Sequence, residues 1–88
     1  MEIAFTDDAK VDLNYWKDHS NTKIQERISQ LILSMRQDPF KGIGKPEPLK
    51  HNLSGMWSRR IDSENRLVYE VSRERITIHG LRGHYKKR

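Results

Sequence analysis

Apolar and polar positions follow a helical spacing in the first part of the chain and a strand-like alternation in the second. Residues 2–5 form a short strand candidate, and Thr6 after them is a favourable helix N-cap followed by acidic residues, which the helix dipole favours in a first turn. The pattern then predicts a helix to about residue 17. Its apolar side chains lie four and three positions apart, which places them on one face: Ala9, Leu13 and Trp16.

The second predicted helix has the clearest periodicity in the sequence. Asn21 or Thr22 caps it, and it ends before Asp38-Pro39, because a proline disfavours a helical residue before it. Its apolar stripe consists of Ile24, Ile28, Leu31 and Met35, with Ile32 beside it. Two amphipathic helices joined by a short polar turn are typical of a helical hairpin.

The rest of the chain predicts strands. Residues 40–48 contain two glycines and two prolines and form the hinge between the two halves. Three strands are predicted at 56–61, 66–71 and 76–81, separated by polar turns of hairpin length, with a further short strand around 49–53. We therefore predict one α+β domain over residues 1–88, in which an N-terminal strand and a helical hairpin pack on one face of a small antiparallel sheet.

Strand alternation assigns the arginines of two strands to a face. If the helices cover the side that carries Trp57, Ile61, Leu67, Tyr69 and Val71, then Arg60 and Arg66 meet on the open face. Arginine is permanently charged and binds phosphate with two parallel hydrogen bonds, so this pair fits a phosphodiester. The alternative is a solvated face on which arginines pair with acids such as Glu70.

Charge and composition restrict the partner class. Residues 1–40 carry five Lys/Arg and seven Asp/Glu, whereas residues 41–88 carry twelve and five, so the net charge of +5 comes from the second half. That concentration fits nucleic acid, and it fits an acidic protein equally well. The chain has no cysteine, which excludes disulfides and thiolate metal ligation, and no apolar run long enough for a membrane span. We expect a cytoplasmic protein that needs no cofactor.

One carboxylate in the hinge is a candidate for chemistry. Glu47 stands between Pro46 and Pro48, which fix their own φ and bias the preceding residues towards extended geometry, so the segment is stiff. Lys45 and Lys50 flank it and favour its ionised form. The simpler interpretation is a solvated, proline-rich turn.

The end of the chain supplies a candidate acid. His84 and Tyr85 follow the last predicted strand, whereas His19 and His51 lie in turns and His79 lies mid-strand, where a structural role is commoner. The histidines lack a metal-ligand spacing. Cleavage of RNA without a metal needs a base for the 2′-OH proton, an acid for the departing 5′-oxygen and cations for the phosphate, and the chain contains each kind of group.

Several runs of sequence together resemble a known family. They are residues 42–50, 52–55, 57–61 and 65–69, the closing His84-Tyr85, and, in the helical half, Tyr15-Trp16 and residues 38–40. In this order they resemble the YoeB toxins of the RelE/ParE superfamily along essentially the whole chain. The resemblance implies a RelE-like microbial RNase fold and a type II toxin–antitoxin toxin that cuts mRNA in the A site of the 30S ribosomal subunit.

The resemblance also implies residue roles and partners. Glu47 would be the general base, His84 the general acid and Arg66 the phosphate-stabilising cation, with Tyr85 orienting the substrate and Lys50, Arg60 and Lys45 binding RNA. The products would be a 2′,3′-cyclic phosphate and a 5′-hydroxyl, without a metal. A YefM-like antitoxin would hold the toxin inactive and carry it to their shared operator DNA, and a homodimer is compatible with the family.

Two alternatives and one departure remain at the level of sequence. A ParE-like inhibitor of DNA gyrase on the same scaffold would need neither acid nor base, and a basic RNA-binding module would bind RNA and leave it uncut. Family members commonly stop at the His-Tyr pair, whereas this chain continues through a basic tail at 86–88. We expect that tail to strengthen salt-dependent RNA association without taking part in the chemistry.

Overall fold

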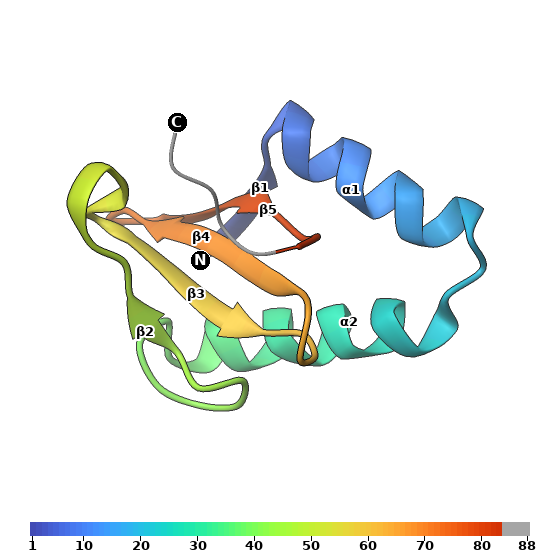
Figure 1. Ribbon diagram of the computed structural model, residues 1–88. Helices are drawn as coiled ribbons and strands as arrows, with labels where there is room; N and C mark the ends of the chain where they lie inside the picture. The colour runs from blue at the N-terminus through green and yellow to red at the C-terminus, as the bar shows by residue number, and fades with distance from the viewer. Residues whose placement is uncertain (84–88) are drawn as a thin grey trace.

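The computed structural model describes residues 1–83, and Figure 1 shows how its elements are arranged. The predicted helical half and strand half are both present, and the three C-terminal strands begin and end within one residue of the prediction. In chain order the elements are β1 (Glu2–Phe5), α1 (Asp7–Asp18), α2 (Thr22–Gln37), β2 (Glu47–Pro48), the 3₁₀ turn η1 (His51–Leu53), β3 (Met56–Arg60), β4 (Arg66–Val71) and β5 (Arg75–Gly80).

Side-chain caps start both helices where the sequence predicts. The Thr6 hydroxyl accepts a hydrogen bond from the Ala9 N–H at 3.1 Å, and the Asn21 side chain accepts one from the Ile24 N–H at 3.1 Å. Each bond satisfies an N–H that has no partner within the helix. Asp38 follows α2 in an extended conformation, as the proline after it requires.

The sheet has the strand order β1-β5-β4-β3-β2. β2 pairs antiparallel with β3, β3 with β4 and β4 with β5, which confirms the predicted meander. The N-terminal strand β1 adds to the sheet as a parallel edge strand, with Ile3 opposite Ile76. The α+β class is therefore confirmed, and the sheet is mixed where the prediction had it antiparallel.

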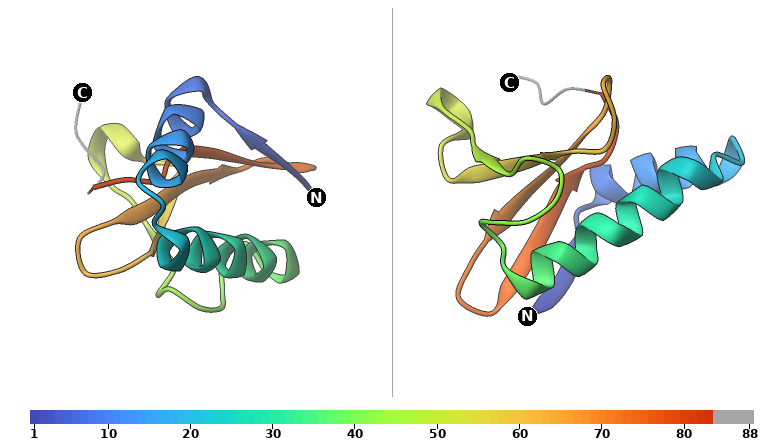
Figure 2. Two further views of the ribbon diagram at one scale, coloured as in Figure 1. Left: turned by 90° about the vertical axis from the view of Figure 1, so that its right-hand side faces the viewer. Right: turned by 90° about the horizontal axis from the view of Figure 1, so that it is seen from below.

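Both helices pack on one face of the sheet, as Figure 2 shows from two sides. The predicted stripe of α2 is buried and meets the inward-facing side chains of β4 and β5. Leu67 and Tyr69 of β4 lie in this core with Ile61, which directly follows β3, and Trp57 and Val71 pack against it. The predicted strand alternation is thus confirmed, and within residues 1–83 neither α1 nor α2 packs its apolar face on the opposite side of the sheet.

The prediction of a short strand around residues 49–53 is wrong. Strand β2 ends at Pro48, and His51 takes a left-handed backbone with φ of +60°, which turns the chain away from the sheet. Hydrogen bonds from Leu53 N–H to Lys50 O (3.1 Å) and from Ser54 N–H to His51 O (3.0 Å) close the 3₁₀ turn in its place. Leu49 nevertheless keeps one sheet bond, from its N–H to Met56 O at 2.9 Å.

Neither helix within residues 1–83 is long and apolar enough to cross a membrane.

Candidate active site

The sheet register brings the hinge carboxylate and the two arginines to the same face. Glu47 lies directly opposite Ser58, and Arg60 lies directly opposite Arg66. Residues directly opposite one another in an antiparallel pair point to the same side, and so do residues two positions apart on one strand. Glu47, Arg60 and Arg66 therefore all belong to the face of the sheet that the helices leave open.

Glu47 is exposed and stands without a close counter-charge among residues 1–83. The ion pairs formed within this part of the chain are Arg75–Glu2 and His79–Glu70, so neither Lys45 nor Lys50 forms a salt bridge with Glu47. Lys45 and Lys50 are exposed, as is Arg60. Lys45 also has a φ of +52°, outside the extended region expected before Pro46.

Arg66 lines a cavity and has an unsatisfied donor. Its Nη1 is buried and has no hydrogen-bond partner among the described residues. A buried N–H of a charged group costs free energy unless an acceptor reaches it, and a phosphate oxygen is a strong acceptor for guanidinium. Arg66 is therefore a position on the open face at which an anion would supply a hydrogen-bond acceptor that residues 1–83 do not provide.

The cavity beside Arg66 has a volume of about 780 Å³ and lies between the open face of the sheet, η1 and the start of α1. Glu47, Lys45, Lys50 and Arg60 are not among its lining residues. Those residues are Thr6, Asp8, Val11, Asp12, Asn52, Leu53, Met56, Arg66, Val68, His79, Gly80, Arg82 and Gly83. The sequence analysis placed Arg66 on the open face but predicted no cavity there. It also missed Arg82 and the contribution of α1, since nothing local in the sequence links those residues.

Residues from distant parts of the chain hold the segment that leads to the predicted acid. The N–H of Arg66 donates to Gly83 O at 2.9 Å, and the N–H of Gly83 donates to Asn65 Oδ1 at 2.7 Å. From the helix side, the N–H of Leu81 donates to Asp12 Oδ2 and Trp16 Nε1–H donates to Leu81 O, both at 2.9 Å. The chain thus reaches Gly83 beside Arg66. The predicted site residues His84 and Tyr85, and the basic tail at 86–88, lie outside the described residues.

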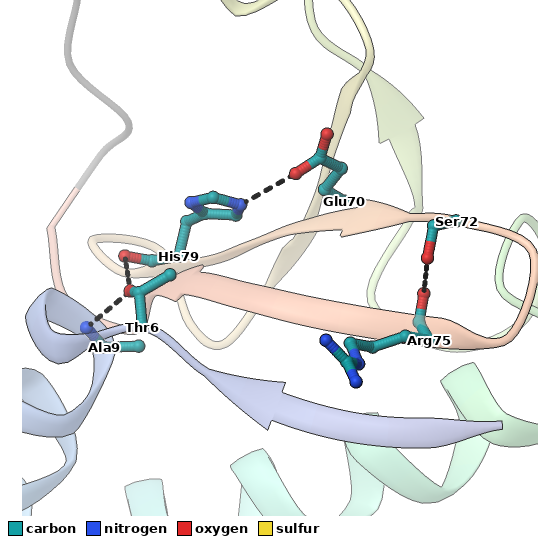
Figure 3. Close-up of polar contacts among 6 residues, drawn as sticks. All are labelled: Thr6, Ala9, Glu70, Ser72, Arg75 and His79. Carbon is teal, nitrogen blue, oxygen red and sulfur yellow. Dashed lines mark hydrogen bonds and ion pairs between the residues drawn. The ribbon is translucent and has the colours of Figure 1, made fainter.

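His79 pairs with Glu70 on the open face. Its Nε2 lies 3.1 Å from Glu70 Oε1, and Figure 3 shows both side chains on the side of the sheet away from α2. The prediction that a mid-strand histidine is hydrogen-bonded is confirmed. The partner that the sequence suggested for the arginines, Glu70, is bound to this histidine.

Sequence reasoning missed one buried cation, Arg59. It has no exposed surface and lies on the helix side of β3, between Trp57 and Ile61. Strand alternation predicts this position, because Arg59 is two residues from both Trp57 and Ile61 and therefore points to the same, inward side of the sheet. The prediction followed only the arginines on the other face.

The chain is a small, basic α+β domain whose open sheet face carries Arg60 and Arg66, and Arg66 lines a cavity in which its Nη1 has no partner within residues 1–83. The chain matches the family of YoeB-like toxins of bacterial type II toxin–antitoxin systems over residues 5–85. This chain belongs to that family.

Relatives and solved structures agree with the assignment. The toxin YoeB of Streptomyces coelicolor is 48% identical over 97% of this chain and 100% of its own length. A YoeB/ParE toxin structure from Agrobacterium tumefaciens superposes with a TM-score of 0.91 at 39% identity, covering 97% and 100% of the two chains. From Staphylococcus aureus, a YoeB dimer (TM-score 0.88, 40% identity) and a YoeB–YefM complex (TM-score 0.87, 41% identity) each match over 97% of this chain and 98% of theirs.

Proposed function

We propose that this toxin is a ribosome-dependent endoribonuclease that cuts mRNA in the A site and thereby stops translation. The observation that carries the proposal is the buried Nη1 of Arg66, which has no hydrogen-bond partner within residues 1–83 and lies in a cavity on the face that also bears Glu47. Membership of the YoeB family supports nuclease activity in general, and the concentration of positive charge in residues 41–88 supports an RNA substrate.

The proposed reaction is acid–base cleavage without a metal. Glu47 removes the proton of the 2′-OH, whose oxygen attacks the adjacent phosphorus, and the bond from phosphorus to the 5′-oxygen breaks. His84 donates a proton to that oxygen, so the products are a 2′,3′-cyclic phosphate and a 5′-hydroxyl. Arg66 stabilises the charge that grows on the phosphate, and Tyr85 orients or stacks on a base.

The sheet geometry is compatible with these roles. Glu47 and Arg66 are separated by two inter-strand intervals and by two residues along β4. With intervals of ~4.8 Å and a rise of ~3.3 Å per residue, their Cα atoms lie roughly 12 Å apart. That separation leaves room for a phosphodiester between the two side chains. Lys45, Lys50 and Arg60 are exposed along the same region and would bind the flanking phosphates.

The partners follow from the family. The YoeB–YefM complex of Staphylococcus aureus supports a YefM-like antitoxin as the inhibitor of this toxin, and the YoeB dimer from the same organism supports a homodimer. Through the antitoxin the complex would bind operator DNA and repress its own operon. The toxin would act in the cytoplasm, where ribosomes translate.

The test is cleavage of a defined mRNA on translating ribosomes, read by primer extension. Wild-type toxin should cut at the A-site codon, and Glu47→Ala or His84→Ala should lower the single-turnover rate by about 10²–10⁴-fold while ribosome binding is retained. Glu26→Ala is the matched control, because Glu26 is also an exposed glutamate but lies on α2. Full cutting by Glu47→Ala would refute its role as base. If wild-type toxin binds ribosomes and leaves mRNA intact, the alternative of a basic RNA-binding module holds. If it leaves mRNA intact and inhibits DNA gyrase, the alternative of a ParE-like gyrase inhibitor is favoured.

The chemistry of the new ends tests the metal-free mechanism separately. A 5′-hydroxyl accepts phosphate from polynucleotide kinase without prior phosphatase treatment, and we expect direct labelling of the downstream fragment. Chelators selective for transition metals, at a Mg²⁺ concentration that keeps ribosomes assembled, should leave the rate unchanged. Ends with a 5′-phosphate would rule out attack by the 2′-OH.

A further inference from the structure

The buried arginine of β3 holds the hinge loop from inside the protein. Arg59 has no exposed surface, and its guanidinium donates five hydrogen bonds. Nε donates to the hydroxyl of Tyr69 (3.1 Å), Nη1 to Ser34 Oγ (2.8 Å) and Ile43 O (3.1 Å), and Nη2 to Asp38 O (2.8 Å) and Lys41 O (3.0 Å). Three of the five acceptors are therefore backbone carbonyls of residues 38–43.

This arrangement is unusual for a buried charge, because all the acceptors are neutral. Taking a guanidinium out of water is costly unless its donors are satisfied, and here every donor bond depends on the loop or on side chains beside it. If the loop moved away, the guanidinium would lose the three backbone carbonyls that accept its hydrogen bonds. Arg59 thus makes one conformation of residues 38–43 strongly preferred.

The loop packs tightly around the arginine as well. A Cβ on Gly42 would meet Arg59 Nη1 at 3.1 Å, and a Cβ on Gly44 would meet Arg59 Cβ at 3.1 Å and Leu31 Cδ2 at 2.7 Å. Both glycines have positive φ, of +130° and +84°. Glycine tolerates such a backbone and lets the loop approach closely, so hydrogen bonding and packing select the same loop conformation.

The loop leads directly into Glu47, whose strand has little support of its own. Strand β2 is two residues long, and Pro46 and Pro48 have no N–H, so only the N–H groups of Glu47 and Leu49 are available to bond β3. Immediately before this strand, the N–H of Arg60 donates to Gly44 O at 2.6 Å. The backbone position of Glu47 therefore depends on the loop that Arg59 holds.

We propose that Arg59 is a positioning residue for Glu47: through the carbonyls of residues 38–43 it sets where the carboxylate stands on the open face of the sheet. Arg59 lies on the opposite face and does not touch substrate. This inference rests on the function proposed above, in which Glu47 is the general base. A displacement of about 1 Å in a catalytic group can cost on the order of 10²-fold in rate, so the effect on cleavage is measurable.

The experiment is a double-mutant cycle on ribosomal cleavage. Arg59→Lys keeps the positive charge but has three donors in place of five, so it cannot reproduce the bonds to the loop. We expect its single-turnover rate at saturating ribosomes to fall by about 10–100-fold, with ribosome affinity unchanged. In a Glu47→Ala background the same substitution should cause no further loss, because the group that Arg59 positions is already absent.

Two further variants keep the result interpretable. Arg73→Lys is the matched control, since Arg73 is exposed and far from the hinge in sequence, and it should cut like wild type. Ser34→Ala leaves the arginine in place and removes the hydroxyl that accepts from both Arg59 Nη1 and the Ile43 N–H of the loop. It loosens the same loop, so it should give the same non-additive pattern with a smaller loss, and it serves if Arg59→Lys does not fold. Circular dichroism and antitoxin binding report the fold of each variant.

The outcomes separate this inference from the function on which it rests. Multiplicative losses for Glu47→Ala and the Arg59 or Ser34 variant would overturn the positioning role, as would unchanged cleavage by Arg59→Lys. Full cleavage by Glu47→Ala alone would instead refute the base assignment.

Discussion

Removing a single hydroxyl should measurably destabilise the core beneath the hinge. The Tyr69 side chain is fully buried on the helix side of β4, and its hydroxyl donates to Pro39 O at 2.7 Å and accepts from Arg59 Nε at 3.1 Å. Tyr69→Phe keeps the ring in the core. It leaves the carbonyl of Pro39 and one N–H of Arg59 without these partners.

The magnitude follows from those two bonds. A neutral hydrogen bond contributes about 0.5–1.5 kcal/mol net and one to a charged group about 1.5–3 kcal/mol. We expect Tyr69→Phe to lower the free energy of unfolding by about 2–4 kcal/mol. For a small domain whose unfolding depends on urea with a slope of about 1.5 kcal/mol/M, the midpoint would fall by roughly 1–3 M.

The pH dependence of stability gives a second, independent signature. Burial raises the pKa of Tyr69 above its ordinary value of 10.0, and the hydrogen bond and positive charge of Arg59 offset this only in part. Above pH ~10 the unfolded chain loses the phenolic proton while the folded chain keeps it, so stability falls as pH rises, by at most about 1.4 kcal/mol per pH unit for one group. Tyr69→Phe should remove this part of the alkaline slope.

Urea unfolding, followed by far-ultraviolet circular dichroism at neutral pH and between pH 9 and 11, measures both effects. Tyr15→Phe is the control, because the Tyr15 ring is half-buried and its hydroxyl forms no hydrogen bond within residues 1–83. A loss below 0.5 kcal/mol for Tyr69→Phe would refute the estimate for the two bonds, since that is the range of ordinary surface changes. An unchanged alkaline slope would show that another group dominates it.

Two further substitutions test the packing around the site. Trp16→Phe removes the buried hydrogen bond from Nε1–H to Leu81 O and should lower the free energy of unfolding by about 1–3 kcal/mol, measured by urea unfolding. An unchanged free energy would mean that this bond does not hold the segment around Leu81 in place. Gly44→Ala forces a Cβ to within 2.7 Å of Leu31 Cδ2 at a φ of +84° and should cost about 1–3 kcal/mol, more than Gly55→Ala, where φ is +96° but nothing lies within 4 Å. Equal losses for the two glycine variants would mean that backbone strain alone matters.

The sequence alone determined the features that depend on near neighbours. Caps at Thr6 and Asn21, the apolar stripes of the helices and the two-residue alternation of the strands act within a few residues, so the elements and the inward faces were predicted. The same alternation correctly placed Arg60 opposite Arg66 on the open face. The family resemblance also came from the sequence, and the match over residues 5–85 confirms it.

Tertiary structure decided what depends on distant partners. The parallel pairing of β1 with β5 has no local signal, because the two strands are separated by both helices and three other strands. The cavity beside Arg66 combines residues of α1, η1 and β5. That Arg66 Nη1 is buried without a partner within residues 1–83 follows only from the folded structure. Strand alternation alone points Arg59 inward, but only the folded loop supplies the carbonyls that accept its hydrogen bonds and let a charge be buried there. Backbone groups take whichever partners the closed chain brings within reach, and local sequence does not specify them.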